Sequence, residues 1–145
     1  MSPGFPAGGG RSGRRVLEGS LVAAGVSGAP STLHALLTRG GGRGAIAYVI
    51  EATRAIGTVI PPGRPGLVRG TVLHLAISLG VGEVLAATLP ERGSWAWGAA
   101  AGLGVGALNV GLIGRAFPAI RALPLAPQLA DHALFGVVFA LVADR

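Results

Sequence analysis

Four long stretches of the chain are almost free of charge, and each is long enough to form a helix that crosses a bilayer. A transmembrane helix needs ~20 mainly apolar residues, because ~1.5 Å of rise per residue must cover ~30 Å of hydrocarbon. Uncharged runs of 20 and 22 residues separate Glu18 from Arg39 and Arg92 from Arg115. The sequence therefore predicts an all-α integral membrane bundle of four transmembrane helices, at about residues 16–38, 70–90, 94–114 and 125–143.

A fifth apolar segment, residues 45–60, is shorter and carries both signs of charge. Ala47, Glu51, Arg54 and Thr58 recur at helical spacing and share one face, while isoleucines and a valine occupy the others. Glycines precede the segment and prolines follow it. We expect an amphipathic helix lying at the membrane interface, although the alternative of a fifth span stays open.

The composition agrees with a membrane protein rather than with a disordered one. Half of the residues are hydrophobic and only 12% are charged, against ~25% in soluble domains, and the mean hydropathy is +0.62. We expect residues 1–15 to form a disordered tail and residues 16–145 a single transmembrane domain. The pair Arg14-Arg15 resembles a twin-arginine signal, but Glu18 and Pro30 interrupt the run that follows, so we expect the first span to be retained.

The basic residues surround the predicted spans instead of forming one stripe. All twelve are arginine, and the formal net charge is +6. Arginines at the ends of apolar runs anchor helices at the membrane surface, so we expect the lipid bilayer as partner and no nucleic acid. The chain has no cysteine and no lysine, which excludes disulfides, thiolate nucleophiles and Schiff bases.

The distribution of arginine leaves two topologies open. Cytoplasmic loops hold the larger share of basic residues. With four spans, seven arginines lie on the side of the amphipathic helix and five on the other, which places the N-terminus outside. If residues 45–60 cross the membrane, the count becomes seven against four and the N-terminus lies inside.

Ionisable residues inside spans are costly and are candidates for function. In the four-span topology His34, His74, Asp131 and His132 fall on the same side of the membrane, and we treat them as one candidate polar cluster. Such a cluster suits a proton or small-solute pathway, or a metal or haem site. No recognised ligand spacing is met, and neighbouring side chains on a helix point ~100° apart, so we expect hydrogen bonds between helices and no metal or cofactor.

Two further features lie within the spans. Glu83 is a candidate proton site, and its alternative role is a carboxylate that reaches the interface or a neighbouring helix. Gly98, Gly102 and Gly106 form a ridge of small residues that Asn109 continues. Ridges of this kind allow close helix packing, so we expect helix packing there, including self-association into a homo-oligomer.

The sequence lacks the motifs of common enzymes. No G-x-S-x-G, H-E-x-x-H or phosphate-binding loop is present, and no inverted repeat is visible between the halves. We therefore expect a non-enzymatic membrane protein with a structural or accessory role.

Three segments carry a family resemblance: residues 26–34 (VSGAPSTLH), 70–78, and 114–124 (GRAFPAIRALP). They resemble small uncharacterised actinobacterial multi-span membrane proteins and are more loosely similar to YagU-like inner-membrane proteins. The resemblance implies a multi-pass protein of a bacterial cell membrane, and it implies no activity. Arginine without lysine, with abundant alanine and glycine, is also typical of a high-G+C bacterial genome.

Overall fold

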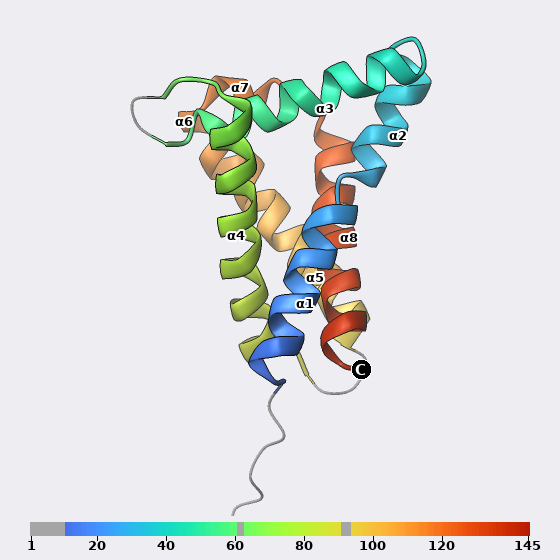
Figure 1. Cartoon of the computed structure of the whole chain (residues 1–145), viewed down its shortest axis with the longest axis vertical. Helices are drawn as coiled ribbons and strands as arrows, with labels where there is room; N and C mark the ends of the chain where they lie inside the picture. Colours follow the sequence, from blue (N-terminus) through green and yellow to red (C-terminus); the bar gives the residue numbers. More distant parts are fainter. Residues whose placement is uncertain (1–10, 61–62, 91–93) are drawn as a thin grey trace, which may run out of the picture.

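The computed structural model describes residues 11–60, 63–90 and 94–145, which form helices and no strand (Figure 1). The elements are α1 (Gly13–Val26), α2 (Ala29–Thr38), α3 (Gly42–Gly57), α4 (Leu67–Thr88), α5 (Ser94–Leu108), the π-helical turn η1 (Asn109–Ile113), α6 (Gly114–Ala116), α7 (Pro118–Arg121) and α8 (Leu125–Ala143). The prediction of four spans is confirmed. The segments Gly13–Thr38, Leu67–Thr88, Ser94–Ala116 and Leu125–Ala143 are long and apolar enough to cross a membrane.

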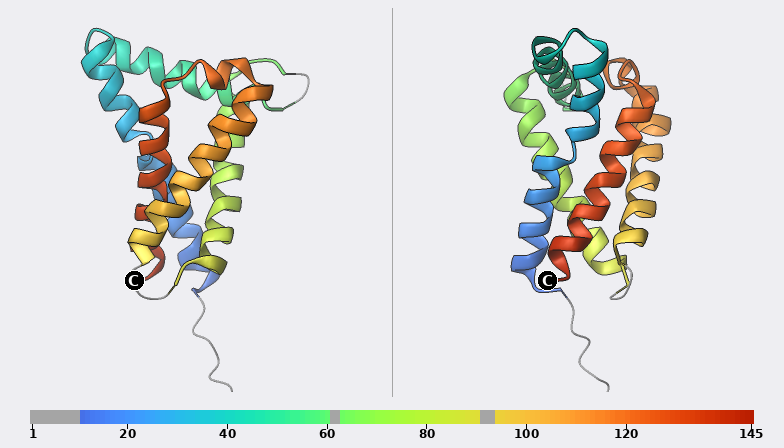
Figure 2. Two further views of the ribbon diagram at one scale, coloured as in Figure 1. Left: turned by 180° about the vertical axis from the view of Figure 1, so that it is seen from behind. Right: turned by 90° about the vertical axis from the view of Figure 1, so that its right-hand side faces the viewer.

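The fourth span, α8, is the centre of the bundle. It packs against α5, α1 and α2, while α4 packs chiefly on α1 and α3 (Figure 2). Phe135 and Phe139 of α8 are buried with Val16 of α1 and Leu85 and Leu89 at the end of α4. The core therefore joins the first, second and fourth spans, and α5 is held mainly through α8.

The first span consists of two helices. Pro30 lies in the first turn of α2, where its missing N–H is not needed, and α1 ends at Val26. The sequence predicts a kink at Pro30, and the structure shows a two-residue interruption, Ser27 and Gly28, between α1 and α2.

The predicted boundary of the N-terminal tail at residue 15 is too late. Helix α1 begins at Gly13, because Ser12 caps it by accepting a hydrogen bond from the Arg15 backbone nitrogen at 3.4 Å. Residues 13–15 are therefore helical, and the part of the predicted tail at residues 1–10 lies outside the described residues.

The predicted amphipathic helix corresponds to α3, which lies across one end of the bundle and does not span it (Figure 1). Its inner face is made of small residues and the ring of Tyr48, which is 2% exposed. Arg43 and Arg54 are exposed on the outer face, while Ile46 and Val49 are exposed on a flank between the two faces. This distribution is typical of a helix at the boundary between headgroups and hydrocarbon.

The glycine ridge lies within the chain's own bundle. Gly98, Gly102 and Gly106 are buried against α8. A Cβ at Gly98 would collide with the backbone carbonyl of Gly136, and a Cβ at Gly102 with that of His132. The ridge is thus filled by α8 and is not presented to a second copy, so self-association needs another surface.

Candidate functional site

The break in the first span leaves backbone groups without their helical partners. In an unbroken helix the Ala24 carbonyl would accept from residue 28, and the Ser31 N–H would donate to residue 27. Ends of helices satisfy such groups with side chains or water. Within a bilayer an unsatisfied group is especially costly, so the residues that replace these partners define the site.

Asp131 of α8 satisfies the start of α2. Its Oδ1 accepts from the Ser31 backbone nitrogen at 2.9 Å, and its Oδ2 accepts from the Ser31 hydroxyl. A carboxylate at a helix N-terminus also complements the positive end of the helix dipole. Asp131 therefore acts as a capping residue supplied by a different span.

His74 of α4 satisfies the end of α1. Its Nε2 lies 3.3 Å from the Ala24 carbonyl oxygen, and since a carbonyl only accepts, the imidazole donates. The Ser27 hydroxyl also donates to this carbonyl at 3.4 Å. The two ends of the break are thus joined to α4 and α8 respectively.

A third helix reaches the same point through Tyr48 of α3. The Tyr48 hydroxyl donates to the Ser31 oxygen at 3.4 Å. The Arg39 guanidinium lies over the Tyr48 ring, 4.8 Å from its centroid, and pairs with Glu51 at 2.7 Å. Ser31 therefore connects α2, α3 and α8, and we call Ala24, Ser31, Tyr48, His74 and Asp131 the break cluster.

His132 lies beside the break cluster without joining it through a hydrogen bond. Its Nδ1 donates to the Gln128 carbonyl of the preceding helical turn at 2.7 Å. His132 directly follows Asp131 on α8, while His74 and Asp131 bind the two ends of the same break, at Ala24 and Ser31. Three of the four predicted cluster residues therefore come together, but no group of three His, Asp or Glu among the described residues is placed to hold a metal ion.

The remaining predicted residues lie elsewhere. His34 is half-buried on α2, and its imidazole makes no hydrogen bond to the part of the chain that the structure describes. Glu83 is exposed on α4 and forms no ion pair within residues 11–60, 63–90 and 94–145. Asn109 is half-buried and begins the π-helical turn η1. None of these three belongs to the break cluster.

Comparison with known proteins gives no assignment. No protein-family model, curated protein or solved structure matches the chain. The resemblance to small multi-span families stays a prediction, and function must be inferred from the site.

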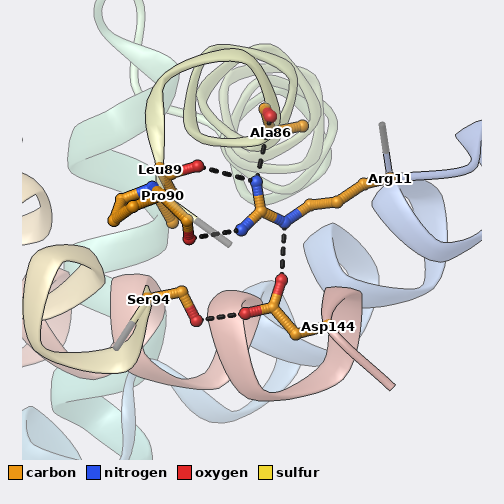
Figure 3. A network of polar contacts seen from close by, with 6 residues as sticks. All are labelled: Arg11, Ala86, Leu89, Pro90, Ser94 and Asp144. Carbon is orange, nitrogen blue, oxygen red and sulfur yellow. Dashed lines mark hydrogen bonds and ion pairs between the residues drawn. The ribbon is translucent and has the colours of Figure 1, made fainter. Parts of the chain in front are cut away.

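A second polar network, which the sequence does not predict, is drawn in Figure 3 and lies at the end of the bundle away from α3 (Figure 1). The Arg11 guanidinium donates to Asp144 at 2.6 Å and to the carbonyl oxygens of Ala86 and Leu89 at 3.1 and 3.0 Å. It also donates to the Pro90 carbonyl oxygen at 3.1 Å. Because α4 ends just before Pro90, these carbonyls lack helical donors. A helix that ends before a proline is the feature of the sequence that indicates a nearby cation.

Asp144 completes this network, which we call the terminal clasp. Its second carboxylate oxygen accepts from the Ser94 hydroxyl at the start of α5. Burial tends to raise the pKa of Asp144, but the hydrogen bonds from Arg11 and Ser94 outweigh it, so the pKa of Asp144 lies below its ordinary value. The clasp thus joins the segment before α1 to α4, α5 and the residue after α8 through a charged pair.

An apolar groove lies between α4 and α5, with a volume of about 390 Å³. Its lining comes from both helices: Ile77, Gly80, Val81, Val84, Leu85, Thr88, Ala101 and Val105. The hydroxyl of Thr88, the one polar side chain in this lining, donates to the Val84 carbonyl of its own helix. The groove is suited to hydrocarbon rather than to a polar solute.

Proposed function

We propose that this integral membrane protein is a non-enzymatic structural or accessory protein of a bacterial plasma membrane. The observation that carries the proposal is the use of two of the candidate ionisable groups, Asp131 and His74, as replacements for backbone partners at the break in the first span. Asp131 satisfies Ser31, and His74 satisfies Ala24. A group engaged in this way stabilises the bundle and is not free to bind a substrate.

The rest of the described polar groups support the same role. No buried side-chain nitrogen or oxygen in the described segments lacks a hydrogen-bond partner. Catalytic sites commonly keep such a group available for the reacting molecule. The polar residues within this bundle therefore fit a structural role. The basic composition, which is arginine alone, fits a bacterial origin.

A proton or small-solute pathway is the second candidate, and one observation favours it. Several transporters bind ions at breaks inside a spanning helix, where the half-helix ends point at the ligand. Here a carboxylate faces the N-terminus of α2 and an imidazole faces the C-terminus of α1. If Asp131 exchanges its partner during a transport cycle, the same geometry becomes a proton site.

A flux assay in liposomes separates the two functions. Wild type, D131N and E83Q are reconstituted with a pH-sensitive dye inside, and a potassium gradient with valinomycin drives proton entry. The structural role predicts that all three match protein-free liposomes, while D131N lowers the unfolding midpoint in detergent. Proton entry in the wild type that D131N abolishes and E83Q preserves would contradict the structural role and establish the pathway.

A further inference from the structure

The end of the bundle that carries α3 is strongly basic. Seven arginines lie there, on or beside α2, α3, α6, α7 and the start of α4, against one acidic residue, Glu51. Glu51 is engaged with Arg39 at 2.7 Å. At the other end two of the four described arginines are paired, Arg11 with Asp144 and Arg14 with Glu18. The positive charge of the molecule is therefore concentrated at the α3 end.

Most of these arginines are exposed. Five of them are exposed and form no ion pair within the described residues: Arg43, Arg54, Arg64, Arg115 and Arg121. We call them the basic rim. Arg54 and Arg121 come from helices that contact each other, α3 and α7. A Cβ added to Gly114, the neighbour of Arg115, would lie 3.7 Å from the Cα of Arg121. The side chains of Arg115 and Arg121 therefore extend from backbone segments that lie next to each other.

The position of the rim relative to apolar side chains indicates its depth. Ile46 and Val49 are 64% and 43% exposed on the flank of α3, and Leu37 at the end of α2 is 76% exposed. Large apolar side chains so exposed belong in hydrocarbon. Arg43 and Arg54 are exposed on the next face of the same helix, so with this flank in hydrocarbon their side chains can reach lipid phosphates.

We infer that the basic rim binds the headgroups of anionic phospholipids in the surrounding bilayer. The planar guanidinium group donates two parallel hydrogen bonds to a phosphate, and the flank of α3 places it at phosphate depth. The apolar flank also distinguishes this ligand from a soluble polyanion, which would meet the rim without covering Ile46 and Val49.

Lipid titration measured by native mass spectrometry tests the inference. Detergent-solubilised protein is titrated with dioleoyl phosphatidylglycerol or, separately, dioleoyl phosphatidylcholine. We expect the anionic lipid to bind at least ~25-fold more tightly, because two arginines alone contribute about that factor. An arginine near a membrane surface contributes about 1 kcal/mol, or about fivefold in affinity, so R43Q/R54Q should weaken binding of the anionic lipid about 25-fold and leave the neutral lipid unchanged.

The matched control is R14Q/R15Q, which removes two exposed arginines from the opposite end of the bundle and should leave lipid binding unchanged. R115Q/R121Q serves as a second rim variant should R43Q/R54Q fail to fold, as judged by helical circular dichroism. Equal affinity for the two lipids, or an equal loss in R14Q/R15Q, would overturn the inference.

Two competition arms distinguish other anions. Glycerol phosphate and a short single-stranded oligonucleotide are added to the complex with the anionic lipid. We expect neither to displace the lipid at a concentration equal to that of the lipid. Displacement by glycerol phosphate would assign the rim to soluble phosphate, and displacement by the oligonucleotide to nucleic acid. Either result would contradict the inference that bilayer lipid is the ligand of the basic rim.

Discussion

The carboxylate of Asp131 on the fourth span accepts hydrogen bonds from both the backbone nitrogen and the hydroxyl of Ser31 on the first. The contact joins residues 100 positions apart in the chain. It places the carboxylate of Asp131 at the positive end of a short helix, with both of its oxygens satisfied.

Removing this carboxylate should destabilise the bundle. D131A leaves the Ser31 N–H without a partner, and an unsatisfied buried donor costs about 1–3 kcal/mol. D131N keeps one acceptor oxygen and should lose less. The measurement is the free energy of unfolding in mixed micelles, with E83A as the exposed carboxylate control. An equal loss in D131A and E83A would refute the capping role.

The imidazole of His74 should contribute less than Asp131. H74F keeps a ring of similar shape but removes the donor to the Ala24 carbonyl, and polar contacts between spans are worth about 0.6–1.7 kcal/mol. H34F, at a half-buried histidine without a hydrogen-bonded imidazole among the described residues, should change stability by less. Thermal unfolding of both variants measures these changes in stability. A larger loss of stability in H34F than in H74F would contradict the role assigned to His74.

Close packing of the third and fourth spans depends on the absence of a side chain at Gly98. G98A places a methyl group against the Gly136 carbonyl, and overpacking of this kind costs about 1–3 kcal/mol. Gly104 lies on the same helix, and a Cβ there meets no atom within 4 Å. G104A should be as stable as the wild type or slightly more stable, because alanine favours helix. Equal unfolding midpoints for G98A and G104A would show that the contact between Gly98 and Gly136 is not closely packed.

The terminal clasp should weaken in acid. Because the pKa of Asp144 is lowered in the folded protein, the carboxylate stabilises the fold above its unfolded pKa of about 3.9. That stability is lost as the pH falls through the folded value. The difference in unfolding midpoint between wild type and D144N should thus be constant near neutral pH and shrink below about pH 4. A difference that persists undiminished in acid would mean that the charge of Asp144 is not what stabilises the clasp.

The excess of arginine at the α3 end predicts the orientation in the membrane. Cytoplasmic segments carry more basic residues, so R145C should react with an impermeant maleimide in intact cells, and R64C only after permeabilisation. The chain has no native cysteine to obscure the labelling. The reverse pattern would place the α3 end outside.

Hydropathy and spacing predict much of this architecture. The spans are defined by charge-free length, and the face shared by Glu51 and Arg54 correctly predicts that α3 does not cross the bundle. Gly98 and Gly102 form a ridge at helical spacing, which points to a packed surface. The ridge does not reveal its partner, because spacing along one helix carries no information about which neighbour covers it.

The contacts at the break cannot be predicted from hydropathy and spacing either, because these patterns do not show which helices are neighbours. Pro30 predicts a kink in the first span, but the partners of Ser31 and Ala24 depend on how α4 and α8 are rotated about their axes. Arg11 is equally hard to place from sequence, because it follows a run of glycines typical of a tail. Its role rests on the carbonyls that Leu89 and Pro90 leave free, 78 and 79 positions away along the chain.

The terminal clasp and the break cluster also impose an order on assembly. Arg11 precedes α1 and Asp144 follows α8, so their ion pair forms only after α8 is in place. Asp131 is likewise on α8, so the start of α2 lacks its cap until the final helix arrives. In a chain inserted from its N-terminus, the start of α2 therefore lacks this cap until α8 has entered the membrane.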